Sequence, residues 1–209
     1  MRCSILLLLI GAVIPAVALA SPPIGPNSTV PSCISLVGSS EGVPATAMGQ
    51  FQVVVRDIAN NTVSGAVVTV DLSSCPDVRL CADQLDPSLT VLCGLKQVSK
   101  VTDATGTSQF TLLGGSSGAG NAVGLLFTGR VSVSGTTIGF ATVCVYDLDG
   151  SGGVGAGDLS AWLTDFGSGN TYGRSDYDCN GSVGAGDLSL WLTAFGSGTM
   201  AQSCASSCP

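Results

Sequence analysis

The hydrophobic pattern of this chain changes character near residue 146. Before that point, short runs rich in β-branched residues show partial alternation of apolar and polar positions, and turn-forming pairs such as Asn60-Asn61 and Gly114-Gly115 separate them. Alternation with a period of two predicts half-buried strands. Amphipathic helical stretches, which a parallel sheet would need between its strands, are not found there. We therefore expect an antiparallel β-sandwich of roughly seven strands over residues 33–146.

After residue 146 the period becomes helical and the sequence repeats. Residues 147–169 align without a gap with residues 176–198, and most of the aligned positions are identical. Each copy predicts a helix that starts at an Asp (158 or 187), ends at a Gly (167 or 196), and packs its apolar stripe against the other helix. The stripes, spaced i, i+3, i+4 and i+7, are Leu159, Trp162, Leu163 and Phe166 in the first copy and Leu188, Trp191, Leu192 and Phe195 in the second.

A twelve-residue loop of the form D-x-D-x-[SN]-G-x-V-G-A-G-D opens each copy. Calcium takes six to eight oxygen ligands, and a calcium loop supplies them from positions 1, 3, 5, 7, 9 and 12, with Gly at position 6 for a sharp turn. Three neighbouring carboxylates repel each other unless a cation lies between them. The candidate ligands, with water at position 9, are Asp147, Asp149, Ser151, the Gly153 carbonyl and Asp158 in the first loop, and Asp176, Asp178, Asn180, the Ser182 carbonyl and Asp187 in the second.

These loops predict two calcium ions, and the alternative is a pair of Gly/Asp-rich turns without an ion. Position 12 is Asp instead of the longer Glu, and position 5 is uncharged, so we expect a dissociation constant on the order of 10⁻⁶ to 10⁻⁴ M. Val154 and Val183 occupy position 8, where we expect a short β bridge between the two loops.

The composition excludes several classes of protein. The chain of 209 residues has no His, 7 Lys and Arg together, and a formal net charge of −7. A Ser-His-Asp or Cys-His catalytic pair, an imidazole metal site and a basic nucleic-acid surface are therefore excluded. Seven acidic residues lie in the β region, but no spacing singles out a catalytic pair, so we expect no enzyme activity.

The N-terminus and the cysteines indicate an exported protein. Arg2, an apolar run and Ala18-Leu19-Ala20 predict a signal peptide over residues 1–20, with an uncleaved anchor as the alternative. We expect a secreted or cell-surface protein without a membrane span in its mature form. The even number of cysteines after cleavage predicts disulfides, because zinc sites would need paired C-x-x-C spacings. These cysteines are Cys33, Cys75, Cys81, Cys93, Cys144, Cys179, Cys204 and Cys208. The pairings we expect are Cys33–Cys144, and Cys179 with Cys204 or Cys208.

Two family resemblances follow from these motifs. The duplicated loop–helix unit, with Asp at position 12 and a "DL-x-x-W/L-L-x-x-F-G" helix, resembles a dockerin over residues 147–198. This resemblance implies a calcium-dependent module that attaches exported proteins to a cohesin-like or cell-surface protein. The family's usual recognition positions, loop positions 10 and 11, are here Ala-Gly in both copies, and no basic side chain appears later in either helix.

The β region resembles bacterial immunoglobulin-like domains of the invasin type over residues 50–115. The matching features are Asp57, Gly65-Ala66-Val67-Val68, Thr102-Asp103-Ala104, Gly106 and Phe110-Thr111. Asp57 and Asp103 have a structural explanation, since an Asp closes a turn by accepting local N–H groups and Gly106 tolerates a positive φ.

The predicted organisation is a signal peptide (1–20), a proline-rich linker or arm (21–32), an immunoglobulin-like β-sandwich (33–146), a dockerin-like calcium module (147–199) and a cysteine-containing tail (200–209). We expect a non-catalytic modular protein for extracellular assembly or surface attachment. The alternative is a component of a polysaccharide-degrading, cellulosome-like complex, with hydrolase or carbohydrate-binding activity in the β domain.

Overall fold

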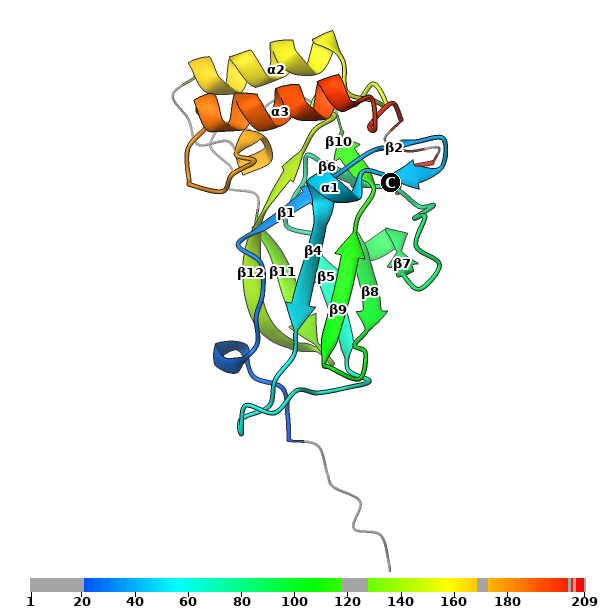
Figure 1. Cartoon of the computed structure of the whole chain (residues 1–209), viewed down its shortest axis with the longest axis vertical. Helices are drawn as coiled ribbons and strands as arrows, with labels where there is room; N and C mark the ends of the chain where they lie inside the picture. Colours follow the sequence, from blue (N-terminus) through cyan, green and yellow to red (C-terminus); the bar gives the residue numbers. More distant parts are fainter. Residues whose placement is uncertain (1–20, 118–127, 169–172, 203, 205, 209) are drawn as a thin grey trace, which may run out of the picture.

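Strands make up most of the regular structure, and the two long helices lie at the C-terminal end of the chain (Figure 1). The computed structural model describes residues 21–117, 128–168, 173–202, 204 and 206–208. The predicted signal peptide lies outside the described residues. No helix in the described part of the chain is long and apolar enough to cross a membrane.

The elements follow one another as a β region and then a helical repeat. The strands are β1 (Cys33–Leu36), β2 (Ser39–Ser40), β3 (Val43–Pro44), β4 (Gln50–Val54), β5 (Val67–Asp71), β6 (Val78–Leu80), β7 (Thr90–Leu92), β8 (Gln97–Val101), β9 (Thr107–Thr111), β10 (Gly114–Ser116), β11 (Thr128–Val133) and β12 (Thr136–Val145). The helices are α1 (Thr46–Gly49), α2 (Ala156–Gly167) and α3 (Ala185–Ser197), with 3-10 turns η1 (Gly25–Asn27), η2 (Cys93–Leu95) and η3 (Gly173–Ser175).

A six-stranded sheet in the order β1-β12-β11-β5-β8-β7 is the largest unit of the β region. Its pairs are antiparallel except for β1 and β12, which run parallel. Three two-stranded sheets, β4-β9, β10-β6 and β2-β3, accompany it. The prediction of a mainly β, largely antiparallel region is confirmed. The described residues form more strands than the roughly seven expected, because several are only two or three residues long.

The core follows from the alternating pattern seen in the sequence. On β4, Phe51 and Val53 are buried, whereas the intervening Gln52 is exposed. Phe110 of β9 lies directly opposite Phe51 in the register, and their rings stack with centroids 5.2 Å apart. Cross-strand aromatic pairs of this kind stabilise a sheet beyond simple burial.

The turns expected at Asp57 and Asp103 are present. Asp103 Oδ1 accepts hydrogen bonds from the backbone N–H groups of Thr105 (2.8 Å) and Thr107 (3.0 Å), and Gly106 has a φ of +76°. Asp57 Oδ1 similarly accepts the N–H of a residue two positions later, at 2.9 Å. The structural role predicted for these two carboxylates is confirmed.

Both ends of the described chain lie against the β region. Residues 21–32, predicted as a linker or arm, include a bridge between Thr29 and Val54 beside β4. The C-terminal tail returns from α3 to β6, where the Cys208 N–H donates to the Leu80 carbonyl at 2.7 Å. The tail contact ties the helical repeat to the β region, and Figure 1 shows α2 and α3 lying against one end of that region.

Candidate metal centres

The first loop gathers three carboxylates immediately after β12. Carboxylate oxygens of Asp147, Asp149 and Asp158 lie within 4.8 Å of one another. Asp147 and Asp158 are buried, whereas Asp149 is exposed. The residues at loop positions 1, 3 and 12 therefore meet at one point in space.

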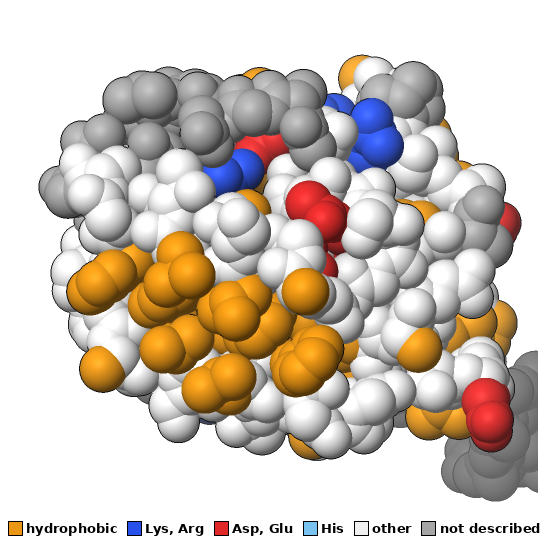
Figure 2. All heavy atoms as spheres, turned by 90° about the horizontal axis from the view of Figure 1, so that it is seen from above, with side chains coloured by type: hydrophobic (Ala, Val, Ile, Leu, Met, Phe, Trp, Pro, Cys, Tyr) orange, Lys and Arg blue, Asp and Glu red, His pale blue; other side chains and the backbone are white. Residues whose placement is uncertain are grey.

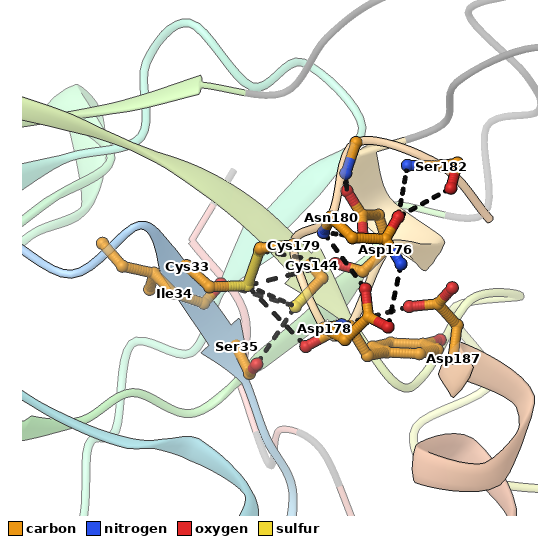
Figure 3. The surroundings of a disulfide bond; sticks show 12 residues. Cys33, Ile34, Ser35, Cys144, Asp176, Asp178, Cys179, Asn180, Ser182 and Asp187 are labelled. Carbon is orange, nitrogen blue, oxygen red and sulfur yellow. Dashed lines mark hydrogen bonds between the residues drawn. A yellow bond between two sulfur atoms is a disulfide. The ribbon is translucent and has the colours of Figure 1, made fainter. Parts of the chain in front are cut away.

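The second loop repeats this arrangement after η3. Carboxylate oxygens of Asp176, Asp178 and Asp187 also lie within 4.8 Å of one another. Here too the first and last residues are buried and the middle one is exposed. Figure 3 shows these side chains beside Asn180 and Ser182. The two clusters are thus equivalent, as the sequence repeat predicts.

Positive φ angles shape both loops at the same positions. Gly152 and Gly181, at loop position 6, have φ angles of +99° and +90°. Position 4 is also left-handed in both copies, with Gly150 at +71° and Cys179 at +55°. The sharp turn predicted at position 6 is confirmed. The N–H groups of these two position-6 glycines donate to the carboxylates of Asp147 (3.1 Å) and Asp176 (2.9 Å).

The position-12 carboxylate closes each loop by accepting backbone N–H groups. Asp158 Oδ2 accepts from Gly155 at 2.6 Å, and its Oδ1 accepts from Leu148 (2.6 Å) and Asp149 (3.0 Å). In the second loop, Asp187 accepts from Gly184 (2.7 Å) and Asp178 (3.1 Å). Each loop is therefore joined to the first turn of its helix through one buried side chain.

The electrostatics of the first cluster favour a cation. Burial raises the pKa of Asp158 to about 6; hydrogen bonds from Asp149 and Gly155 oppose that rise, and the charges of Asp149 and Asp147 add to it. In the second cluster, burial likewise raises the pKa of Asp176. A bound cation would relieve both the burial cost and the mutual repulsion of these groups.

The donor set fits calcium. All ten candidate donors are carboxylate, amide, hydroxyl or carbonyl oxygens, the ligands of hard cations such as calcium and magnesium. Two oxygens bound to one calcium ion are separated by at most about 5 Å, which is twice the calcium–oxygen distance. The 4.8 Å limit on both carboxylate clusters satisfies this condition.

Glycine at loop position 11 lets the position-3 carboxylate approach the helix. A Cβ placed on Gly157 would overlap the carboxylate of Asp149, and one placed on Gly186 would lie 2.7 Å from Asp178 Oδ2. Neither glycine has a positive φ, so the reason for glycine here is space. The Ala-Gly pair at positions 10 and 11 therefore has a role inside the loop.

The helices differ from the prediction in their limits. They begin at Ala156 and Ala185, two residues before the expected Asp, because the position-12 Asp occupies the third position of the helix and accepts the N–H of its N-cap glycine. α2 ends at Gly167 as predicted. α3 continues past Gly196 to Ser197, and the left-handed residue that follows is Gly198.

The apolar stripes do not pack wholly against each other. Trp162 and Trp191 are buried, and Leu159 and Leu188 are partly buried. The other two positions of each stripe point outward and leave about half of their surface exposed; these residues are Leu163, Phe166, Leu192 and Phe195. Each buried Trp fills the space beneath its helix, so the remaining large side chains of the stripe stay at the surface.

The bridge expected between the two position-8 valines is not formed. The Val154 N–H donates instead to the Met200 carbonyl at 3.2 Å, and no bridge joins Val154 to Val183 within the described ranges. The residues after α3 run alongside the first loop and take this hydrogen bond.

The disulfide pairings predicted from the sequence are wrong. Cys33 is bonded to Cys179 and not to Cys144, whose sulfur atom lies 3.8 Å from that of Cys33 (Figure 3). The tail cysteines bond to the β region because the tail passes the first loop and reaches β6. The remaining pairs are Cys81–Cys204 and Cys93–Cys208, and the described cysteines without a disulfide are Cys75 and Cys144, both buried.

A buried ion cluster that the sequence reasoning missed holds the repeat on the β region. Arg174 of η3 donates to Asp165 of α2 (2.8 and 2.9 Å) and to Asp77, which precedes β6 (2.5 Å). All three side chains are almost fully buried. A signal was present in the repeat, since Asp165 corresponds to Ala194 in the second copy and so serves a purpose outside the calcium loop.

Tyrosine contacts reinforce this attachment beside the second loop. Tyr177 stacks on Tyr146 with ring centroids 4.5 Å apart, and its hydroxyl donates to the Val145 carbonyl at 3.0 Å. The second loop is therefore fixed to the end of β12 by aromatic packing and a hydrogen bond, and to β1 by the Cys33–Cys179 disulfide.

Comparison of the chain with protein-family models, with curated proteins and with solved structures finds no match.

Proposed function

We propose that this chain is an exported, non-catalytic modular protein whose dockerin-like repeat binds two calcium ions and mediates extracellular assembly or surface attachment. One observation carries the proposal: the same three-carboxylate cluster, with the same N–H bonds to its first and last members, recurs in the second copy of the repeat. A turn without an ion does not need three carboxylates close together. Their mutual repulsion raises the free energy of the loop, and a bound cation offsets it.

Calcium has a structural role in this proposal. Each ion would join residues of the loop to a carboxylate in the first turn of the following helix, Asp158 or Asp187. Binding would then contribute free energy to the folded arrangement of the repeat. The β region, which we propose to be an immunoglobulin-like sandwich, is the platform for the repeat; its largely antiparallel pairing supports this assignment.

The carboxylates of the β region support a non-catalytic role. Those of Asp57 and Asp103 close turns. Three more pair with cations, Asp71 with Arg130, Asp77 with Arg174, and Asp86 with Lys100. Asp83 accepts a hydrogen bond from the Ser206 hydroxyl at 2.6 Å. Each of these contacts gives its carboxylate a structural role.

Calorimetric titration of the oxidised, chelator-treated protein with calcium tests the proposal. We expect two sites, of which Asp158→Ala removes the first and Asp187→Ala the second, so each variant retains one site as an internal control. Asp83→Ala, which removes an exposed carboxylate outside the loops, should leave both. If adding calcium to the wild-type protein produces no heat and no rise in melting temperature, the proposal is overturned.

A further inference from the structure

Large apolar side chains form a repeated patch on the outside of α2 and α3. Figure 2 shows apolar side chains gathered on the face seen from above, where Figure 1 places these helices. The patch, called the outer apolar face below, consists of Leu163 (54% exposed), Phe166 (53%), Leu192 (49%) and Phe195 (51%). Leu163 and Phe166 of the first copy correspond to Leu192 and Phe195 of the second, so each copy of the repeat contributes the same two side chains to the face.

The phenylalanine rings of this face are held in place from beneath. Phe166 stacks on the buried Trp162 with ring centroids 5.3 Å apart, and Phe195 stacks in the same way on the buried Trp191 at 5.4 Å. A contact surface whose side chains are already fixed loses less conformational entropy when a partner covers it. The outer apolar face is therefore preorganised.

The helices that carry this face present no charge to solvent. Their only charged residues, Asp158, Asp165 and Asp187, are almost completely buried. The whole chain nevertheless has a formal net charge of −7. A basic protein, a nucleic acid or a lipid headgroup would find no ionic partner on these helices, whereas a second uncharged face can approach without like charges meeting.

Polar side chains beside the face already have hydrogen-bond acceptors in their own helices. Thr164 Oγ1 donates to the Ser160 carbonyl at 2.9 Å, and Thr193 Oγ1 donates to the Ser189 carbonyl at 2.8 Å. Covering these hydroxyl groups leaves no donor unsatisfied, so the usual cost of burying them is avoided. This arrangement suits a dry interface.

We propose that the outer apolar face is the interface of a homodimer, in which it meets the same face of a second copy of this chain. Residues that are uncharged, apolar and duplicated within one patch suit an isologous contact, where each copy contributes the same surface. The inference rests on the proposed assembly role and gives that role a specific partner.

The area of the face is consistent with a dimer of modest affinity. An aromatic side chain has about 150–250 Å² of surface, so four half-exposed large side chains present on the order of 400 Å². Two such faces would remove about 800 Å² of apolar surface from water, which is less than the roughly 1,200 Å² of stable interfaces and corresponds to a weak, transient contact. We therefore expect a weak dimer that forms at high protein concentration.

Sedimentation velocity of the oxidised full chain in calcium, over about 1 to 300 μM, tests the proposal. We expect the average mass to rise toward twice that of the monomer. Leu192→Asp should increase the dimer dissociation constant by about 100-fold or more, because covering the face would then bury a charge that has no partner. Phe140→Asp, at an exposed site on β12 (63%), is the matched control and should dimerise like the wild type.

Calcium titration of the same samples separates this inference from the proposed function. Two calcium sites in Leu192→Asp would show that the variant is folded. A wild-type protein that binds calcium but stays monomeric over the whole range would overturn the homodimer and leave calcium binding intact. Dimerisation unaffected by Leu192→Asp, or lost in Phe140→Asp, would also overturn it. A dimer without calcium binding would support the face and contradict the proposed function.

Discussion

The sulfur atom of Cys144 lies 3.8 Å from that of Cys33, although Cys33 is bonded to Cys179 of the second Asp-rich loop. The Cys144 thiol is buried beside β1, where the Ser35 hydroxyl lies 3.0 Å from it. Burial raises the pKa of Cys144 to about 12, so at neutral pH almost none of it is the thiolate that attacks disulfides. The Cys33–Cys179 bond therefore persists next to a third, unreactive sulfur.

Removing Cys179 should change the partner of Cys33. In Cys179→Ser, refolded with oxidised glutathione, we expect a Cys33–Cys144 disulfide, because the two sulfurs need to approach by only about 2 Å to reach bonding distance. Peptide mapping under non-reducing conditions would identify the pair. Cys144→Ser/Cys179→Ser is the control and should leave Cys33 as a thiol. Alkylation of both Cys33 and Cys144 in the unfolded single variant would contradict the prediction.

The ion cluster around Arg174 should contribute strongly to stability. Arg174→Met leaves the buried carboxylates of Asp77 and Asp165 without their cation, which costs about 3–5 kcal/mol of unfolding free energy. Lys100→Met is the comparison, because Lys100 and Asp86 both stay partly exposed where they pair, and such a pair contributes about 1 kcal/mol or less. Chemical denaturation measures both. Equal losses in the two variants would refute the assigned role of Arg174.

Local sequence spacing predicts the calcium loops well because each loop is a short, continuous segment. The positions of Asp147, Asp149 and Asp158 within one twelve-residue loop fix which side chains can converge, and the structure brings them together. The turn at Gly152 follows for the same reason, since glycine adopts a positive φ without steric cost. Calcium binding in these loops stays a prediction.

Contacts between distant segments were not predictable in this way. The Cys33–Cys179 bond joins residues 146 positions apart, and its formation depends on how the repeat sits on the β region. The outward orientation of Phe166 depends on Trp162 filling the space beneath α2. A helical period shows which residues share a stripe, but the packing around the helix decides how much of that stripe is covered.

Without calcium, the protein should become less stable as the pH rises from about 4 to about 6. The folded state holds a proton on Asp158 up to a pKa of about 6, whereas the unfolded chain releases it near 3.8, so the folded state binds more protons in this window. The difference corresponds to at most about 3 kcal/mol. The lowered pKa values of Asp57, Asp71, Asp86, Asp103 and Asp149 act in the opposite direction, mainly below about pH 4, and the raised pKa of Asp176 adds to the decline.

Melting temperatures measured in chelator between pH 4 and pH 7 test this dependence. We expect Asp158→Asn to flatten the decline, and Asp83→Asn, which changes an exposed carboxylate, to preserve it. With calcium present the trend should reverse, because the cation binds the deprotonated carboxylates and competes with the proton. A melting temperature that rises from pH 4 to pH 6 in the chelator-treated wild-type protein would contradict the burial assigned to Asp158.

A methyl group at Gly157 should weaken the first calcium site. The added Cβ overlaps the Asp149 carboxylate, and to avoid it this ligand must move away from Asp147 and Asp158. We expect Gly157→Ala to raise the calcium dissociation constant of the first site by about tenfold or more, equivalent to about 1.4 kcal/mol. The second site should be unchanged, because its own position-11 glycine is intact.

Gly167→Ala provides the matched control within the same helix. A Cβ at Gly167 meets no atom within 4 Å, so this change should leave both calcium sites as they are and stabilise the protein by about 0.4–1 kcal/mol, because alanine reduces the freedom of the unfolded chain. Calorimetric titration and thermal unfolding of both variants would separate a steric effect on the ligand from a general effect of alanine on the helix. If Gly157→Ala binds calcium as tightly as Gly167→Ala, Asp149 is not a ligand in the position that the structure gives it.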